Sequence, residues 1–116
     1  MITVSPSAKI FLAVESVDFR NGINGFGKIC RQKLRQDPMK GAFFVFRNRR
    51  KTTIKILIYD GESFWLITRR LSNGKLKWWP IALQSPGTIT PKEFQTLLMN
   101  GNPESAEFGD DWKKLT

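Results

Sequence analysis

The spacing of apolar residues predicts one amphipathic helix in the first third of the chain. Between Ile23 and Leu34, apolar residues recur at steps of three and four, which is the spacing of one helical face. We therefore predict a helix over Ile23–Gln36. It ends before Pro38, because the residue that precedes a proline is pushed out of the α region. Cys30 lies on the apolar stripe, and we interpret it as a small core residue.

Aromatic, β-branched and alternating segments predict the strands of a sheet. A short apolar run predicts a first strand over Lys9–Val14. Asp60-Gly61 and Asn73-Gly74 are strong hairpin signals, and Pro80 ends the last strand because it has no N–H to donate to a ladder. Tight connections predict an antiparallel meander of four strands, namely Ala42–Phe46, Thr52–Tyr59, Ser63–Leu71 and Lys75–Trp79.

A second helix is predicted near the C-terminus. Thr90-Pro91-Lys92-Glu93 is a capping box with proline at the first helical position, and Gly101 suits the end of the helix. The fold class is therefore α+β: an antiparallel sheet of four to five strands, with one helix packed on a face and a C-terminal helix. We predict a single basic domain over residues 1–101. We interpret residues 102–116 as an acidic tail and name Phe108, Trp112 and Leu115 as the residues through which it would dock.

Composition narrows the function classes. The apolar fraction of 41% suffices for a core, and 19 basic against 10 acidic residues give a net charge of +9. Residues 1–92 carry 17 basic and 5 acidic groups, a balance of +12, whereas residues 93–116 have a balance of −3. The chain has no histidine and one cysteine, which excludes histidine-dependent catalysis, histidine-ligated zinc and an internal disulfide. We expect no metal and no cofactor, and nucleic acid is the leading partner class.

The basic residues gather at two predicted hairpin tips. The planar fork of arginine suits phosphate and the guanine edge, and a protruding β-ribbon fits the major groove of DNA. The alternative is an ordinary solvated turn in a basic protein. We predict that the bound DNA is double-stranded. The residues that we predict to bind it are Arg47, Arg49, Arg50, Lys51 and Lys55 in the first group and Arg69, Arg70, Lys75 and Lys77 in the second.

The sequence gives weaker support to metal-dependent catalysis, to base stacking and to nucleotide binding. A metal-dependent nuclease needs converging carboxylates, and Asp18 and Asp60 are its candidates. Asp60 precedes glycine, which turn geometry explains better, and Asp18 is expected to cap or pair locally. Trp79 is the tryptophan most expected to be exposed, beside the lysines, where it would stack on bases. The glycines of residues 22–27 lack the spacing of a nucleotide-binding loop and are interpreted as serving a turn and tight packing.

The N-terminal region predicts neither export nor membrane insertion. Its apolar run, Ile10–Val14, is too short for a signal peptide or a membrane span, and the sequence before it lacks a basic segment. Together with a single cysteine, this predicts a cytoplasmic protein, with association with the nucleoid as an option.

Several blocks of the sequence are familiar in their order and spacing. They are Asp18–Phe26, Phe44–Arg50, Ile54-Lys55, Tyr59–Gly61, Arg69–Leu71 and Trp79-Pro80. On these blocks, between about Ile10 and Pro80, the chain resembles TnpB, the accessory protein encoded by the second open reading frame of the IS66 family of bacterial insertion sequences. Ser72 and Leu76 depart from that pattern. Asp18, Arg20 and Trp79 are further motif positions that the resemblance singles out.

The resemblance implies a role in transposition beside a separate transposase, without catalysis. It does not extend to the RNA-guided nuclease that shares the name TnpB. Taken with the basic tips, it predicts a non-catalytic accessory protein that binds DNA. The alternatives are a protein-interaction module that docks on the transposase and, less favoured, a metal-dependent nuclease. The sequence does not determine the oligomeric state.

Overall fold

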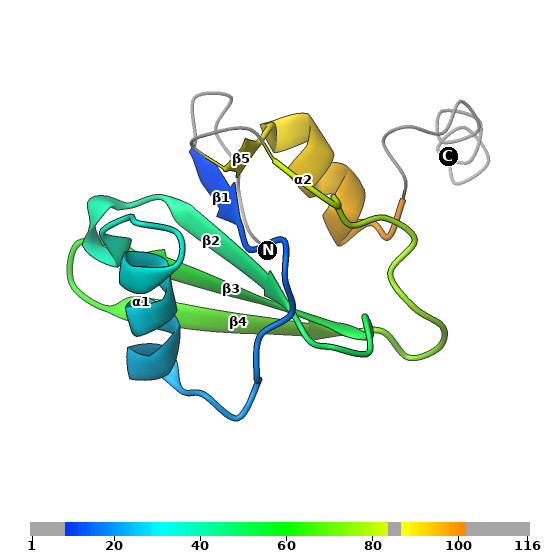
Figure 1. The fold of residues 1–116 in the computed structure, drawn as a ribbon, viewed down its shortest axis with the longest axis horizontal. Helices are drawn as coiled ribbons and strands as arrows, with labels where there is room; N and C mark the ends of the chain where they lie inside the picture. Colours follow the sequence, from blue (N-terminus) through cyan, green and yellow to red (C-terminus); the bar gives the residue numbers. More distant parts are fainter. Residues whose placement is uncertain (1–8, 84–86, 102–116) are drawn as a thin grey trace.

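The computed structural model of the protein describes residues 9–83 and 87–101. In this part of the chain, five strands form one sheet in the order β4-β3-β2-β1-β5 (Figure 1). β1 pairs with β2 in parallel, and every other neighbouring pair is antiparallel. The α+β class, a sheet of four to five strands and the C-terminal helix are thereby confirmed, although the fifth strand, Thr88–Ile89, is not one that the sequence predicts. The elements are β1 (Ile10–Leu12), α1 (Ile23–Gln32), β2 (Phe43–Arg47), β3 (Thr53–Tyr59), β4 (Phe64–Arg70), β5 (Thr88–Ile89) and α2 (Pro91–Leu98).

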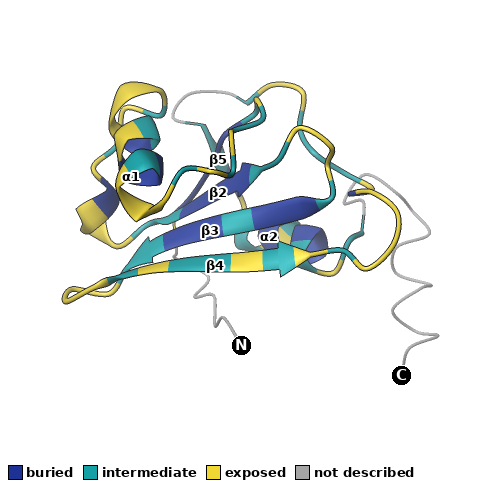
Figure 2. Cartoon of the chain, turned by 90° about the horizontal axis from the view of Figure 1, so that it is seen from below, coloured by how far each residue is buried: buried dark blue, intermediate teal, exposed yellow. Residues whose placement is uncertain are grey.

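The two helices cover opposite faces of the sheet (Figure 2). On one face, Phe26 and Cys30 of α1 pack against Phe44 and Phe46 of β2, and all four side chains are fully buried. On the other face, α2 contributes to the second core cluster. Successive residues of the central strand β2 therefore enter different cores, which is why its sequence reads as a continuous apolar run.

The segment Lys75–Trp79 is not a strand, so the prediction of a second hairpin at Asn73-Gly74 is wrong. The apolar side chain of Leu76 is buried in the core on the α2 face, and its N–H donates to Lys51 O at 2.8 Å. The segment therefore crosses the end of the sheet instead of pairing with β4. The meander has three strands, β2, β3 and β4, while β1 and β5 complete the sheet on its other side.

The first helix is shorter than its sequence pattern predicts. It ends at Gln32 rather than Gln36, because Arg35 takes a left-handed conformation (φ 55°) that lets the Gln36 N–H donate to Cys30 O at 2.9 Å. This i to i−6 bond closes the end of the helix through the left-handed residue. Pro38 begins a short 3-10 helix, Pro38–Lys40, instead of only ending α1.

The turn signal at Asp60-Gly61 and the capping box at Thr90 are confirmed. At the β3–β4 hairpin, Gly61 has φ +99°, which favours glycine. At the start of α2, Glu93 N–H donates to Thr90 Oγ1 at 3.0 Å and Thr90 N–H donates to Glu93 Oε1 at 2.9 Å. In the first turn of α1, a Cβ on Gly25 would lie 2.6 Å from Asn21 Oδ1, so this glycine does serve tight packing. None of the helices in the described residues is long and apolar enough to cross a membrane.

Candidate nucleic-acid interface

The turn between β2 and β3 carries three exposed cations on a braced backbone. Asn48 Oδ1 accepts hydrogen bonds from the N–H groups of Thr52 (2.9 Å) and Thr53 (3.1 Å), and Asn48 Nδ2 donates to Thr52 Oγ1 at 2.8 Å. Lys51 N–H closes the turn on Asn48 O at 3.2 Å, with Lys51 at φ 60°. These bonds hold the intervening residues, Arg49 and Arg50, at the tip with their side chains exposed.

Backbone hydrogen bonds join this turn to the second group of basic residues. Leu71 N–H donates to Thr52 O at 2.9 Å, and Leu76 N–H donates to Lys51 O at 2.8 Å. The register places Arg70 opposite Thr53, at the same end of the sheet as the turn. We call this region the basic end; its residues are Arg47, Arg49, Arg50, Lys51, Arg69, Arg70, Lys75 and Lys77. Although one of the two hairpins was predicted wrongly, the two basic groups lie together.

Carboxylates do not neutralise the basic end in the part of the chain that the structure describes. The one ion pair among these residues joins Arg20 and Asp18, at 2.8 Å. Asp60 and Glu62 lie in the β3–β4 hairpin at the opposite end of the sheet, and Glu93 is engaged in the capping box of α2. The basic end therefore carries a concentrated positive field that favours a polyanion.

Arg47 and Trp79 lie together at the margin of the basic end. The Cζ atom of Arg47 is 5.9 Å from the centroid of the Trp79 ring, and Arg47 Nη1 donates to Asn48 O at 3.1 Å. Trp79 is half-buried, and its Nε1–H is shared between Ala13 O (3.1 Å) and Val14 O (3.2 Å). The exposed tryptophan is Trp65 instead, at 56%, so the expectation that Trp79 is the most exposed is wrong.

Lys55 lies apart from the other predicted DNA-binding residues. Its position in β3 directs the side chain toward the face covered by α1, where Nζ is 5.4 Å from the Phe19 ring centroid and 5.7 Å from that of Phe26. The half-buried ammonium group is stabilised there by the ring quadrupoles. Lys55 is therefore placed to support the core. Most residues of the basic end are exposed at one end of the sheet, whereas Arg47 and Arg69 are partly buried, with Arg47 Nε and Arg69 Nη1 out of contact with solvent.

The two carboxylates considered for a metal centre do not converge. Asp18 accepts two side-chain hydrogen bonds from Arg20 Nε and one from Nη2, and these bonds lower its pKa to about 2. Asp60 accepts from the Trp65 indole at 2.8 Å and from the N–H groups of Ser63 and Glu62, which lower its pKa to about 2. Val17, next to Asp18, is bonded to Arg47 O at the basic end, so the two acids lie at opposite ends of the sheet.

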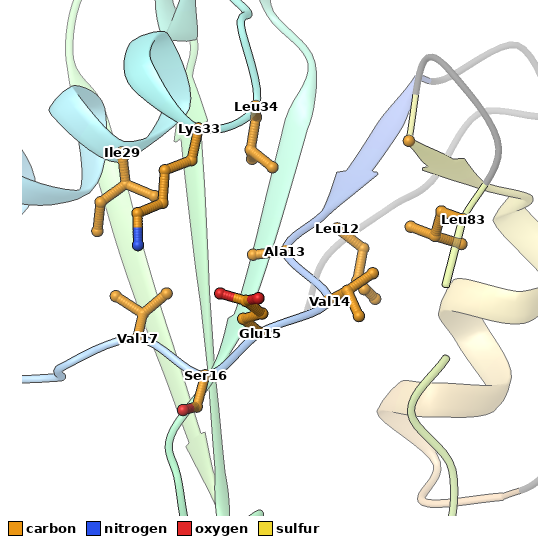
Figure 3. Close-up of a pocket in the computed structure, with 11 residues that line it drawn as sticks. Leu12, Ala13, Val14, Glu15, Ser16, Val17, Ile29, Lys33, Leu34 and Leu83 are labelled. Atoms are coloured by element: carbon orange, nitrogen blue, oxygen red, sulfur yellow. The ribbon is translucent and has the colours of Figure 1, made fainter. Parts of the chain in front are cut away.

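A separate apolar pocket lies beside β1 (Figure 3). It has a volume of about 320 Å³ and runs between Ile29 and Leu34 near the end of α1 and Leu83 on the far side, with Lys33 and Glu15 as its charged residues. The pocket contains none of the residues predicted to bind DNA. Nothing in its lining resembles a phosphate-binding site, so it does not contribute to the basic end.

Sequence patterns did not single out the residues that hold the basic end together. Asn48 braces the tip, and Asn100 Oδ1 accepts from the Lys77 N–H at 2.9 Å, which anchors the second basic group to the end of α2. Asparagine followed by two threonines is a weak turn signal that supports the role of Asn48. The bond to Asn100 joins residues 23 positions apart in the sequence, and no local pattern indicates it.

The chain belongs to a known class of accessory proteins from mobile elements. Within it, the family is the one described as IS66 Orf2 like protein, whose sequence profile matches residues 8–107. The match extends well past Pro80, where the resemblance described above ends, so β5 and α2 belong to the shared pattern as well. The family associates the chain with insertion-sequence transposition.

Two relatives from Sinorhizobium fredii cover nearly the whole chain. "Uncharacterized protein y4jC" is 34% identical over 115 residues, which are 99% of this chain and 90% of the relative. "Uncharacterized protein y4hO" is 27% identical over 113 residues, which are 97% of this chain and 90% of the relative. No solved structure matches the chain. The predicted boundary after residue 101 stays a prediction, and the docking residues Phe108, Trp112 and Leu115 lie outside the described residues.

Proposed function

We propose that this chain is a non-catalytic DNA-binding factor of insertion-sequence transposition that holds phosphate groups with its basic end. The observation that supports this most is the pair of backbone bonds from Leu71 and Leu76 to the β2–β3 turn. They unite two basic groups that are about 20 residues apart in the sequence. Family membership indicates the process, and the arrangement of charge favours nucleic acid as the class of partner.

The form of the basic end suits the phosphate backbone of a duplex. Arg49, Arg50 and Lys51 project from a turn whose backbone is fixed by Asn48, so their attachment points lose little freedom on binding. Guanidinium groups bind phosphate oxygens in a bidentate manner. Lys75 and Lys77, both exposed, extend the same surface. Docking on a transposase remains a second prediction, which rests on residues 102–116.

We propose that the chain is not catalytic because of where its candidate acids, Asp18 and Asp60, lie and what they bind. Asp18 and Asp60 lie at opposite ends of the sheet, and each accepts its hydrogen bonds from neighbours in sequence. In the part of the chain that the structure describes, no three or more Asp, Glu or Cys side chains gather into a group that could hold a metal ion. Both acids are better explained as parts of local turns.

Charge reversal at the tip tests the proposal. We expect Arg49→Glu/Arg50→Glu to weaken binding of a fluorescent duplex at least about ten-fold near 0.1 M salt, because two phosphate contacts are lost. The matched control is Arg31→Glu/Lys40→Glu, which makes the same change in net charge at exposed sites away from the basic end. Fluorescence anisotropy measures affinity, and circular dichroism checks the fold.

The control variant, Arg31→Glu/Lys40→Glu, separates the effect of the position of the charges from the effect of net charge. It should bind within about three-fold of the unchanged protein, because its charges lie beside the start of β2 rather than at its end. Equal weakening in both variants would point to net charge alone. Unchanged binding in the folded Arg49→Glu/Arg50→Glu variant would contradict the proposed interface.

A further inference from the structure

β4 forms one margin of the sheet, and no other described segment pairs with its outer edge. The strand is seven residues long, whereas β5 at the other margin has two. In Figure 2, β4 runs along the margin of the sheet, and neither helix is drawn in front of it. A long edge strand presents a row of unpaired N–H and C=O groups that favours the addition of another strand.

The hydrogen bonds to β3 show which groups of β4 point outward. Asp60 N–H donates to Ser63 O at 3.1 Å before the strand, and Leu71 N–H donates to Thr52 O at 2.9 Å after it. Bonded residues alternate along an antiparallel ladder, so the odd-numbered residues between them bond to β3. The even-numbered residues direct their N–H and C=O groups to the free edge. They are Phe64, Leu66, Thr68 and Arg70.

We propose that β4 pairs in an antiparallel manner with β4 of a second copy of this chain, about a two-fold axis at Ile67. In this register, Leu66 of one copy and Thr68 of the other form a hydrogen-bonded pair, and so do Phe64 and Arg70. The outward N–H and C=O groups of both copies are then satisfied along all seven residues. The joined sheet would have ten strands, with the same face of each copy on the same side.

Side-chain chemistry favours this register over its alternatives. Trp65 is 56% exposed, with its indole N–H bonded to Asp60 Oδ2, and it shares a face of β4 with Arg69. Antiparallel pairing about Ile67 sets Arg69 opposite Trp65 and Arg70 opposite Phe64, so that each arginine position of one copy faces an aromatic position of the other. A parallel arrangement would instead set the arginine pairs of the two copies side by side, where like charges repel.

A shift of the register by one or more positions is less favourable. Centring the pair on Arg69 or Arg70 brings identical cations together. Centring it on Leu66 leaves the last two positions of β4 opposite the hairpin residues Ser63 and Glu62, outside the strand. Pairing about Ile67 is the register that uses the whole strand and keeps like charges apart.

If the basic end binds DNA, as proposed above, the pairing of two copies also determines how DNA is arranged around the dimer. In the dimer, Arg69 and Arg70 lie against the aromatic residues of the second copy, and the remaining cations of the basic end stay free. Because the two copies of β4 run in opposite directions, the two basic ends face away from each other along the strands. Such a dimer would hold two duplexes rather than clamp one.

Cysteine cross-linking of the full chain tests the register. In a non-hydrogen-bonded antiparallel pair, Cα atoms lie about 4.5 Å apart, which a disulfide spans. Ile67→Cys should therefore cross-link on mild oxidation to twice the chain mass of 13.4 kDa. Thr68→Cys is the matched control, because diagonal positions lie about 7–8 Å apart and bridge poorly. Cys30 is buried and unreactive, so it adds little background.

If the inference holds, the cysteine at position 67 cross-links efficiently and the cysteine at position 68 cross-links poorly. We expect at least about five-fold more disulfide dimer at position 67 than at position 68 in the same time. Dominant cross-linking of Leu66→Cys would establish the other register and overturn this one. Equal cross-linking at positions 67 and 68, or none at either, would overturn the pairing itself. None of these readouts uses DNA, so they are independent of the function proposed above.

Sedimentation of a proline variant tests the edge without altering Ile67. Thr68 is exposed and its N–H points outward, so Thr68→Pro removes a bond to the second copy and none to β3. We expect the unchanged protein and the Thr68→Val control to be dimers at tens of micromolar, and Thr68→Pro to be a folded monomer. If Thr68→Pro is unfolded, Trp65→Lys replaces it, since a lysine opposite Arg69 repels. A monomeric unchanged protein, or dimeric folded variants, would contradict the inference.

Discussion

At the scale of single residues, side chains that looked suited to chemistry mostly hold turns. Asp60 has the required charge for a metal ligand, yet it accepts bonds from the Trp65 indole and from two backbone N–H groups of its own hairpin. Asp18 is held by Arg20. Aspartate is common in turns because its short side chain reaches nearby N–H groups. Because aspartate can serve either as a metal ligand or as a turn residue, only its contacts in the structure show which role it has.

Asp60 makes the stability of the fold sensitive to acid. Hydrogen bonds from Trp65, Ser63 and Glu62 lower the pKa of Asp60 from 3.8 to about 2 in the folded chain. A carboxyl group whose pKa is lowered by folding stabilises the fold above its ordinary pKa, and this contribution is lost as pH falls toward 2. In Asp60→Asn, we expect a lower melting temperature at pH 7 and a shallower decline between pH 4 and pH 2.

The neighbouring carboxylate provides the control for this measurement. Glu62→Gln removes a negative charge from the same hairpin and leaves the bonds to Asp60 in place, so its acid profile should follow that of the unchanged protein. Asp18, whose pKa is also lowered to about 2, titrates in all of these variants and accounts for the remaining decline. Identical profiles for Asp60→Asn and Glu62→Gln would show that the hairpin bonds do not couple to stability.

At the scale of elements, local sequence patterns predicted well which segments form helices and strands. They predicted less well how the strands pair with one another. The Asp60-Gly61 hairpin and the capping box at Thr90 involve residues within a few positions of one another, and both are confirmed. Asn73-Gly74 is an equally strong local signal, and Gly74 does turn the chain with φ +73°. The turn does not lead to a strand, because burial of Leu76 in the core on the α2 face and its bond to Lys51 are more favourable than pairing with β4.

The β2–β3 turn provides a test at this scale. Asn48→Ala removes the acceptor for the Thr52 and Thr53 N–H groups and the donor to Thr52 Oγ1. We expect the free energy of unfolding to fall by about 1–2 kcal/mol, the range for losing partly buried hydrogen bonds. Asn48→Asp retains the accepting oxygen and should lose less. Urea unfolding measures both, and equal losses would show that the bonds to Oδ1 do not brace the turn.

At the scale of the whole molecule, the fold gathers basic residues from two parts of the sequence. The basic groups of residues 47–51 and 69–77 meet at one end of the sheet, while Asp60 and Glu62 lie at the other. The exposed edge of β4 is a second feature that exists only in the assembled sheet, because it depends on which strand lies at the margin. Family membership associates the chain with insertion-sequence transposition, and it does not say what the basic end or the edge of β4 binds.

The dependence of DNA affinity on salt is a property of this whole surface. If five to seven cations of the basic end contact phosphates, the logarithm of the affinity should fall with the logarithm of salt concentration with a slope of about −5 to −6. In Arg49→Glu/Arg50→Glu, the slope should become shallower by about 2. Anisotropy titrations between about 50 and 200 mM salt measure it. A slope near −1 would show that the basic end does not bind as a unit.

The sequence by itself determined the helices, four of the strands in outline, the β3–β4 hairpin, the cap of α2 and the excess of positive charge before residue 93. These depend on the periodicity of side chains and on turn chemistry, which act between near neighbours. Only the tertiary structure decided that β1 pairs in parallel with β2, that Lys75–Trp79 crosses the end of the sheet, and that Trp79 is bonded to β1's neighbours Ala13 and Val14. These outcomes are contacts between segments far apart in the sequence, chosen by burial and backbone hydrogen bonding of the whole chain.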